Sequence, residues 1–200
     1  MRHRERTTTG TIILAAALVL LLPVFATAQA VSVQLTATEV FDPLGLLPNG
    51  VAVGAFTNPG TVACPGHEPT GNPTQPCPPG SRMTFRDVGW QSRVMSSSPL
   101  LTGWFYNVGN NNFDANATGQ VWGTFRIELD AGGVWHGSWT ADRSKVGDMW
   151  VIRVLGVGRG IGGAIDGMQL RFTEVAPMPT FMPIVWLGSM DAEVLSPPIR

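Results

Sequence analysis

The sequence predicts an all-β domain that closes into an antiparallel barrel of about eight strands. Several segments alternate apolar and polar residues with a period of two, and turns rich in Gly, Asn and Pro separate them at short spacing. No stretch after residue 30 shows the 3.6-residue apolar period of a helix. Gly89, Gly103, Gly123 and Gly137 fall inside the expected strands, as they do where strands coil around a closed sheet. A Greek-key β-sandwich is the alternative.

The first element, residues 1–30, has the features of a secretory signal peptide. Arginines precede an uncharged apolar run at 11–22, and 28–30 supply a small-x-small cleavage site. The run is shorter than the roughly 20 residues that span a bilayer. We therefore expect cleavage, no remaining membrane span, and a single mature domain, 31–200, that is secreted or periplasmic.

The mature chain then reads as a succession of strands. The segment 31–41 starts with Val and Leu on one face and Ser, Gln and Thr on the other. The clearest hairpin is 119–141, which turns at Ala131-Gly132-Gly133. The Asn-rich run 109–116 and the segment 142–147 are expected turns. The expected strands are 31–41, 51–57, 81–95, 100–108, 119–130, 134–141, 148–158 and 168–175, followed by short pieces at 184–187 and 192–195.

A proline-rich loop at 58–80 contains both cysteines of the chain, Cys64 and Cys77. An exported protein enters an oxidising compartment, where two cysteines favour a disulfide. A metal site is disfavoured because one pair with twelve intervening residues lacks the spacing of metal ligands. We predict a structural disulfide and no metal.

The composition excludes some classes of partner. Charged residues make up 14% of the chain and the formal net charge is −1, so no basic face is available to neutralise nucleic-acid phosphates. The glycine run at 158–163 leads into another strand rather than a helix, which disfavours a nucleotide site. We expect no cofactor.

Four residues are candidates for binding a ligand. The chain has 7 tryptophans, and Trp122 and Trp135 flank the 119–141 hairpin, where they could line an apolar site instead of packing in the core. Arg153 and Glu174 are charged residues on strand faces that are otherwise apolar. If those faces point inward, a buried carboxylate would have a raised pKa and could perform acid–base chemistry. A structural Arg–Glu pair or a strand end is the alternative.

The segment GVGRGIGGAIDGMQLRF at 156–172, together with the W-x-G and G-x-W pattern of the 119–141 hairpin, resembles allene oxide cyclase and dirigent-type barrels. It is also similar to small secreted bacterial proteins of unknown function that share this calycin-like barrel. The resemblance covers about 119–175. It implies an eight-stranded closed barrel with an apolar lumen, often in a homo-oligomer. No motif transfers a catalytic residue, so none is assigned, and the 58–80 loop departs from the plant members.

These observations favour a secreted, non-enzymatic barrel that binds a small apolar or aromatic ligand in its lumen. The nucleophile elbow G-x-S-x-G is absent and no triad spacing is recognisable, so a hydrolase is disfavoured. One alternative is an extracellular scaffold that uses the 58–80 loop as its contact site. Another is a cyclase- or dirigent-like enzyme that guides a reactive intermediate in the lumen. A barrel of this size can be packed with side chains or hold one ligand, and that difference separates the alternatives.

Overall fold

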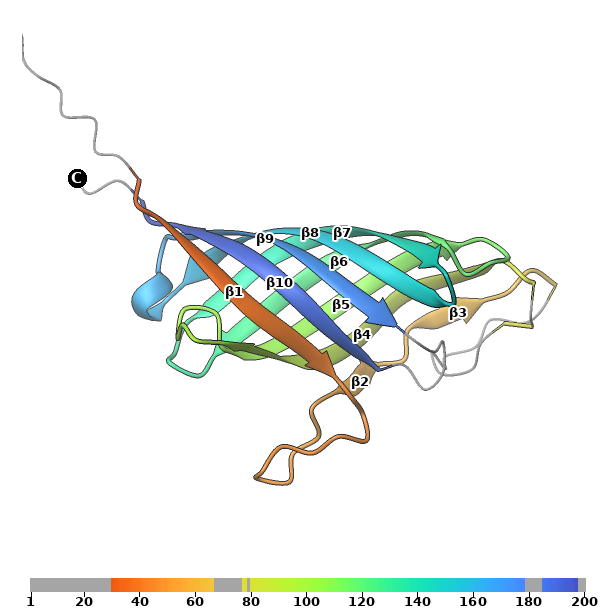
Figure 1. The fold of residues 1–200 in the computed structure, drawn as a ribbon, viewed down its shortest axis with the longest axis horizontal. Helices are drawn as coiled ribbons and strands as arrows, with labels where there is room; N and C mark the ends of the chain where they lie inside the picture. The colour runs from red at the N-terminus through yellow and green to blue at the C-terminus, as the bar shows by residue number, and fades with distance from the viewer. Residues whose placement is uncertain (1–29, 67–76, 79, 179–184, 198–200) are drawn as a thin grey trace, which may run out of the picture.

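The computed structural model describes residues 30–66, 77–78, 80–178 and 185–197. It is an all-β structure in which eight antiparallel strands close into a barrel, so the fold class predicted from the sequence is confirmed. Figure 1 shows these strands running obliquely along the long axis of the molecule. The signal peptide predicted for 1–30 lies, up to residue 29, outside the described residues.

The barrel order is β1-β10-β9-β8-β7-β6-β5-β4, and β4 pairs back with β1. Two short strands, β2 and β3, pair with β4 outside this circuit. A 3₁₀ turn, Gly163–Ile165, lies between β8 and β9. The strands are β1 Ser32–Phe41, β2 Ala55–Asn58, β3 Thr61–Ala63, β4 Met83–Ser96, β5 Gly103–Phe113, β6 Gly119–Leu129, β7 Val134–Val146, β8 Met149–Ile161, β9 Gln169–Met178 and β10 Trp186–Leu195.

Alternating burial along the strands defines the interior of the barrel. In β9, each residue of the series Leu170, Phe172, Glu174, Ala176 and Met178 is buried, while most of the residues between them are exposed. Successive side chains of a strand point to opposite faces of the sheet, so this series points into the lumen. The same two-residue period that predicted strands from the sequence therefore also identifies the lining of the lumen.

Three phenylalanines fill one part of the lumen. Phe105, Phe125 and Phe172 pack edge-to-face against each other, with ring centroids 5.4–6.1 Å apart. Gly156 makes this packing possible, because a Cβ atom at that position would overlap the ring of Phe172. Together with buried aliphatic residues such as Leu170, these rings form a core that closes the lumen on one side.

The barrel closes at a short seam. β1 and β4 pair over only four residues of each strand, from Ala37 opposite Ser96 to Val40 opposite Arg93. Beyond this point β1 ends, and β2 and β3 take its place along β4. Phe41, the last residue of β1, stacks on Trp186 of β10 with ring centroids 4.2 Å apart and packs against Phe56 of β2. The seam therefore ends in a cluster of aromatic rings.

The turn predicted for 109–116 is wrong in its first half, because β5 continues to Phe113. The opposing strand β4 has a bulge between Phe85 and Val88. Asn111 accepts a hydrogen bond from the Phe85 backbone N–H (3.1 Å), and Asn110 accepts one from the N–H of Asp87 (3.1 Å). The asparagine side chains thus satisfy backbone donors that the bulge removes from the ladder, a role that turn propensity alone does not reveal.

Other boundaries also differ from prediction. β7 extends through 142–146, a segment that lies wholly within the predicted turn 142–147, and pairs with β8 along its full length. The short pieces predicted at 184–187 and 192–195 are joined in one strand, β10, which begins at Trp186, and residue 184 lies outside the described residues. The predicted 58–80 loop contains β3 near its start, and its residues 67–76 and 79 lie outside the described part of the chain. The Cys64–Cys77 disulfide is confirmed, with the two Cα atoms 5.6 Å apart.

Candidate functional site

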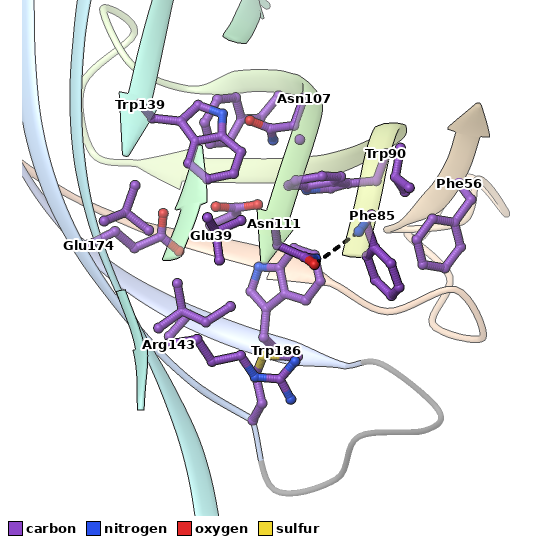
Figure 2. Close-up of a pocket in the computed structure, with 18 of the residues that line it drawn as sticks. Glu39, Phe56, Phe85, Trp90, Asn107, Asn111, Trp139, Arg143, Glu174 and Trp186 are labelled. Carbon is purple, nitrogen blue, oxygen red and sulfur yellow. Dashed lines mark hydrogen bonds between the residues drawn. The ribbon is translucent and has the colours of Figure 1, made fainter. Parts of the chain in front are cut away.

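A cavity of about 120 Å³ occupies the part of the lumen that the phenylalanine core leaves open. Most of its lining is apolar and aromatic, and a few polar groups converge on it, as is typical of small-molecule sites. Figure 2 shows the labelled side chains directed toward this space. The lining residues are Glu39, Phe56, Phe85, Val88, Trp90, Phe105, Asn107, Gly109, Asn111, Phe113, Val121, Trp139, Arg143, Ile152, Val154, Glu174, Ala176, Met178 and Trp186.

Three tryptophans form a corner of the cavity wall. Trp90 of β4 meets Trp139 of β7 with centroids 5.8 Å apart at 66°, and it meets Trp186 of β10 at 6.2 Å and 87°. Gly109 of β5 leaves space for this arrangement, since a Cβ atom there would come within 2.6 Å of the Trp90 ring. The cavity is thus bordered by indole rings that meet at steep angles.

Two glutamates face each other inside the lumen. Glu39 of β1 and Glu174 of β9 are 4% and 3% exposed. The strand that separates them, β10, carries Gly188 directly opposite Glu39 in the sheet. A Cβ atom at Gly188 would collide with the carboxyl group of Glu174. The missing side chain therefore lets Glu174 reach across β10 toward Glu39.

Burial raises the pKa of both carboxyl groups. For Glu174, repulsion by Glu39 and their mutual hydrogen bond add to burial and hold the pKa well above its ordinary value. For Glu39, hydrogen bonds from Glu174, Ser92 and Trp186 partly offset the effect of burial. The Ser92 hydroxyl donates to Glu39 Oε1 at 2.5 Å. Two carboxyl groups in contact at an apolar site repel each other when both are ionised, and this favours a protonated form of the pair.

Further polar groups line the same space. Asn107 of β5 is 4% exposed and lines the cavity. The buried indole Nε1 of Trp90 has no acceptor among the described residues. A buried donor without a partner costs on the order of 1–3 kcal/mol. A bound molecule with an acceptor atom would recover part of that free energy.

Arg143 of β7 lies at the edge of the cavity and also lines a second, wider hollow near Cys77 and Trp150. Its guanidinium lies over the rings of Phe113 and Trp150, 4.9 and 5.3 Å from their centroids. Burial lowers the pKa of Arg143 to about 10, so it remains a cation at neutral pH. Arg143 thus separates the lumen from the outer hollow.

Of the four residues predicted to bind a ligand, Glu174 alone lines the cavity. Arg153 lies exposed on the outer face of β8 and donates to the Ser144 hydroxyl at 3.1 Å, so the expectation that it shares the lumen with Glu174 is wrong. Trp122 also faces outward, with Arg86 over its ring. Trp135 is fully buried in the core, where its indole N–H donates to the Leu100 carbonyl at 2.8 Å. Trp122 and Trp135 therefore lie on opposite faces of the sheet.

Sequence reasoning missed Glu39, although a signal was present. Val33, Leu35, Ala37, Glu39 and Phe41 follow one another with a period of two, so Glu39 is an acid on the apolar face of a predicted strand. The indoles of Trp90, Trp139 and Trp186 gave no comparable signal, because their strands are distant in sequence. Within the described residues, no group of three His, Cys, Asp or Glu side chains could hold a metal ion.

No family model, curated protein or solved structure matches this chain. A family relationship with allene oxide cyclase and dirigent-type barrels stays a prediction. Its structural implication, an eight-stranded closed barrel, agrees with the observed topology. In the described part of the chain, no helix has the length and apolar character needed to cross a membrane.

Proposed function

We propose that this chain is an exported barrel that binds a small apolar or aromatic molecule in its lumen. The observation that carries the proposal is the cavity of about 120 Å³ bordered by Trp90, Trp139 and Trp186. An engineered apolar cavity of about 150 Å³ binds benzene, so this space suits a ligand with a single ring. The Cys64–Cys77 disulfide is compatible with an oxidising compartment outside the cytosol.

Ligand-observed NMR with toluene and benzyl alcohol tests this proposal on the purified protein. Ala176 of β9 lines the cavity, so Ala176→Phe fills it and should abolish the signal transfer to either compound. Thr173→Phe is the matched control, because Thr173 lies exposed on the outer face of the same strand. Binding that survives Ala176→Phe but is lost in Thr173→Phe would place the site outside the barrel.

The two alternative functions, an extracellular scaffold and a cyclase- or dirigent-like enzyme, require different features of the protein. A scaffold that contacts partners through 58–80 does not need an open lumen, and filling the cavity would leave its interactions intact. A cyclase- or dirigent-like enzyme needs the cavity and a polar group within it, for which Glu174 is available and the outward-facing Arg153 is not. The Ala176→Phe variant therefore separates the scaffold from both functions that use the lumen.

A further inference from the structure

The polar side chains of the cavity indicate which chemical class of ligand it would bind. Among the described residues that line it, the charged or titratable groups are Glu39 on β1, Glu174 on β9 and Arg143 on β7. The two carboxyl groups contact each other, whereas Arg143 lies against Phe113 and Trp150. The cavity therefore has an acidic end, which the Glu39–Glu174 pair forms.

The acidic end adjoins the indole corner. Glu39 receives a hydrogen bond from Trp186, and Trp186 meets Trp90 edge-to-face at 6.2 Å. Figure 2 shows the Glu39 carboxyl group between Trp139 and Trp186. The face of an aromatic ring attracts a cation within about 6 Å, and desolvation strengthens that attraction. Indole rings next to a buried carboxyl pair are a combination that can recognise an organic ammonium ion.

We propose that the cavity selects a ligand that carries a protonated amine on a small apolar body, with the ammonium group between the tryptophan corner and the Glu39–Glu174 pair. This inference rests on the proposed ligand-binding function and specifies its ligand class. The ammonium N–H groups would donate to Glu39 and Glu174, and the apolar body would lie against the aromatic walls. Asn107, which is buried and lines the cavity, would offer its amide oxygen as a further acceptor.

The geometry is also consistent with a purely structural pair. Ser92 of β4 donates to Glu39 of β1, so this bond fastens the seam where those two strands pair over few residues. That role alone would not require an adjoining cavity lined by Trp90, whose indole N–H is left without an acceptor among the described residues. A purely structural pair predicts no preference for an amine over an alcohol or a carboxylate. Binding measurements therefore distinguish a structural pair from a ligand-binding one.

The test compares benzylamine, benzyl alcohol and benzoate, which share one ring and differ in the charge of the attached group. At pH 7 we expect calorimetric titration to give a dissociation constant for benzylamine at least tenfold below that of benzyl alcohol, with benzoate weakest. Acidification should weaken benzylamine binding as the carboxyl pair becomes fully protonated, and it should leave benzyl alcohol binding unchanged. Glu174→Gln and Glu39→Gln should reduce the preference for the amine to less than threefold.

Asp191→Asn is the matched control, because Asp191 is an exposed carboxylate on the outer face of β10. It should leave the amine preference intact. Equal binding of benzylamine and benzyl alcohol to the native protein would overturn the inference while leaving the proposed function standing. Tightest binding of benzoate would also overturn it and would shift the recognition to Arg143. If none of the three compounds binds and toluene also fails, the proposed function itself falls.

Discussion

Replacing Glu174 by glutamine should change how the stability of the barrel depends on pH. Glu174 is 3% exposed, and burial and Glu39 hold its pKa well above the ordinary value. In the unfolded chain the same group titrates near 4.5. Between these two pKa values the folded protein keeps a proton that the unfolded chain releases. Rising pH therefore favours unfolding across this window, and the free energy of unfolding of the native protein falls.

The magnitude follows from proton linkage. One proton held by the folded state and released on unfolding changes the free energy of unfolding by about 1.4 kcal/mol per pH unit. Glutamine cannot ionise, and its amide N–H can donate to Glu39 the hydrogen bond that protonated Glu174 donates. The variant should therefore lose this slope without losing the hydrogen bond. At pH 7 it should be more stable than the native protein.

Urea unfolding at intervals from pH 4.5 to pH 8 measures this effect, with Asp191→Asn as the control. Other groups that titrate in this range contribute equally to all three proteins and cancel in the difference. We expect the stability difference between Glu174→Gln and the native protein to grow in favour of the variant as pH rises. A difference that stays constant over the whole range would refute a shared, proton-holding pair in the folded state.

Three further predictions concern packing and the disulfide. Gly188→Ala should destabilise the barrel by about 1–3 kcal/mol because its methyl group collides with Glu174, and adding Glu174→Ala should restore most of that loss in a double-mutant cycle. Trp135→Ala should cost about 3–5 kcal/mol in urea unfolding, because Trp135 is fully buried. The corresponding change at the outward-facing Trp122 should cost about 1 kcal/mol or less, and equal costs would contradict their placement on opposite faces. Replacing Cys64 and Cys77 by serine should lower stability by about 3 kcal/mol through loop closure, and a thermal melt unchanged from the native protein would contradict a stabilising disulfide.

The sequence predicts the strands well because their signal is local. A period of two in β1, β6 and β9 depends only on neighbouring residues, and the Ala131-Gly132-Gly133 turn lies between the two strands it connects. Turn propensity misled where a side chain had a partner on another strand. Asn110 and Asn111 extend β5 because they cap the β4 bulge, which the sequence around them does not encode.

Which face of a strand points inward was harder to predict, and β8 shows why. Its outward face carries Val151, Arg153 and Leu155, so it resembles a core face with one charged residue. Its inward face includes Gly156 and Gly158, whose missing side chains make room for Phe172 and Phe125. Large residues on neighbouring strands fill the space that these glycines leave. The sequence therefore left open which face of β8 points inward, and Arg153 was kept as a candidate for the lumen.

Of the Glu39–Glu174 pair, Glu174 was predicted from the sequence, whereas Glu39 and the contact between the two were not. Glu174 stands out as an acid on the apolar face of β9, and Glu39 follows the same rule on β1. Their contact depends on strand order, because β1, β10 and β9 must be neighbours, and on the absence of a side chain at Gly188. Neither condition can be derived from local pattern.

A crystal structure of the protein grown with benzyl alcohol would show directly whether a ligand occupies the lumen. Ligand-observed NMR detects binding, whereas electron density locates the bound molecule. We expect density for one ring bordered by Trp90, Trp139 and Trp186, with the hydroxyl group of the ligand toward the Glu39–Glu174 end of the cavity. A lumen filled by protein side chains, with the ligand absent or bound on the outer surface, would contradict this expectation.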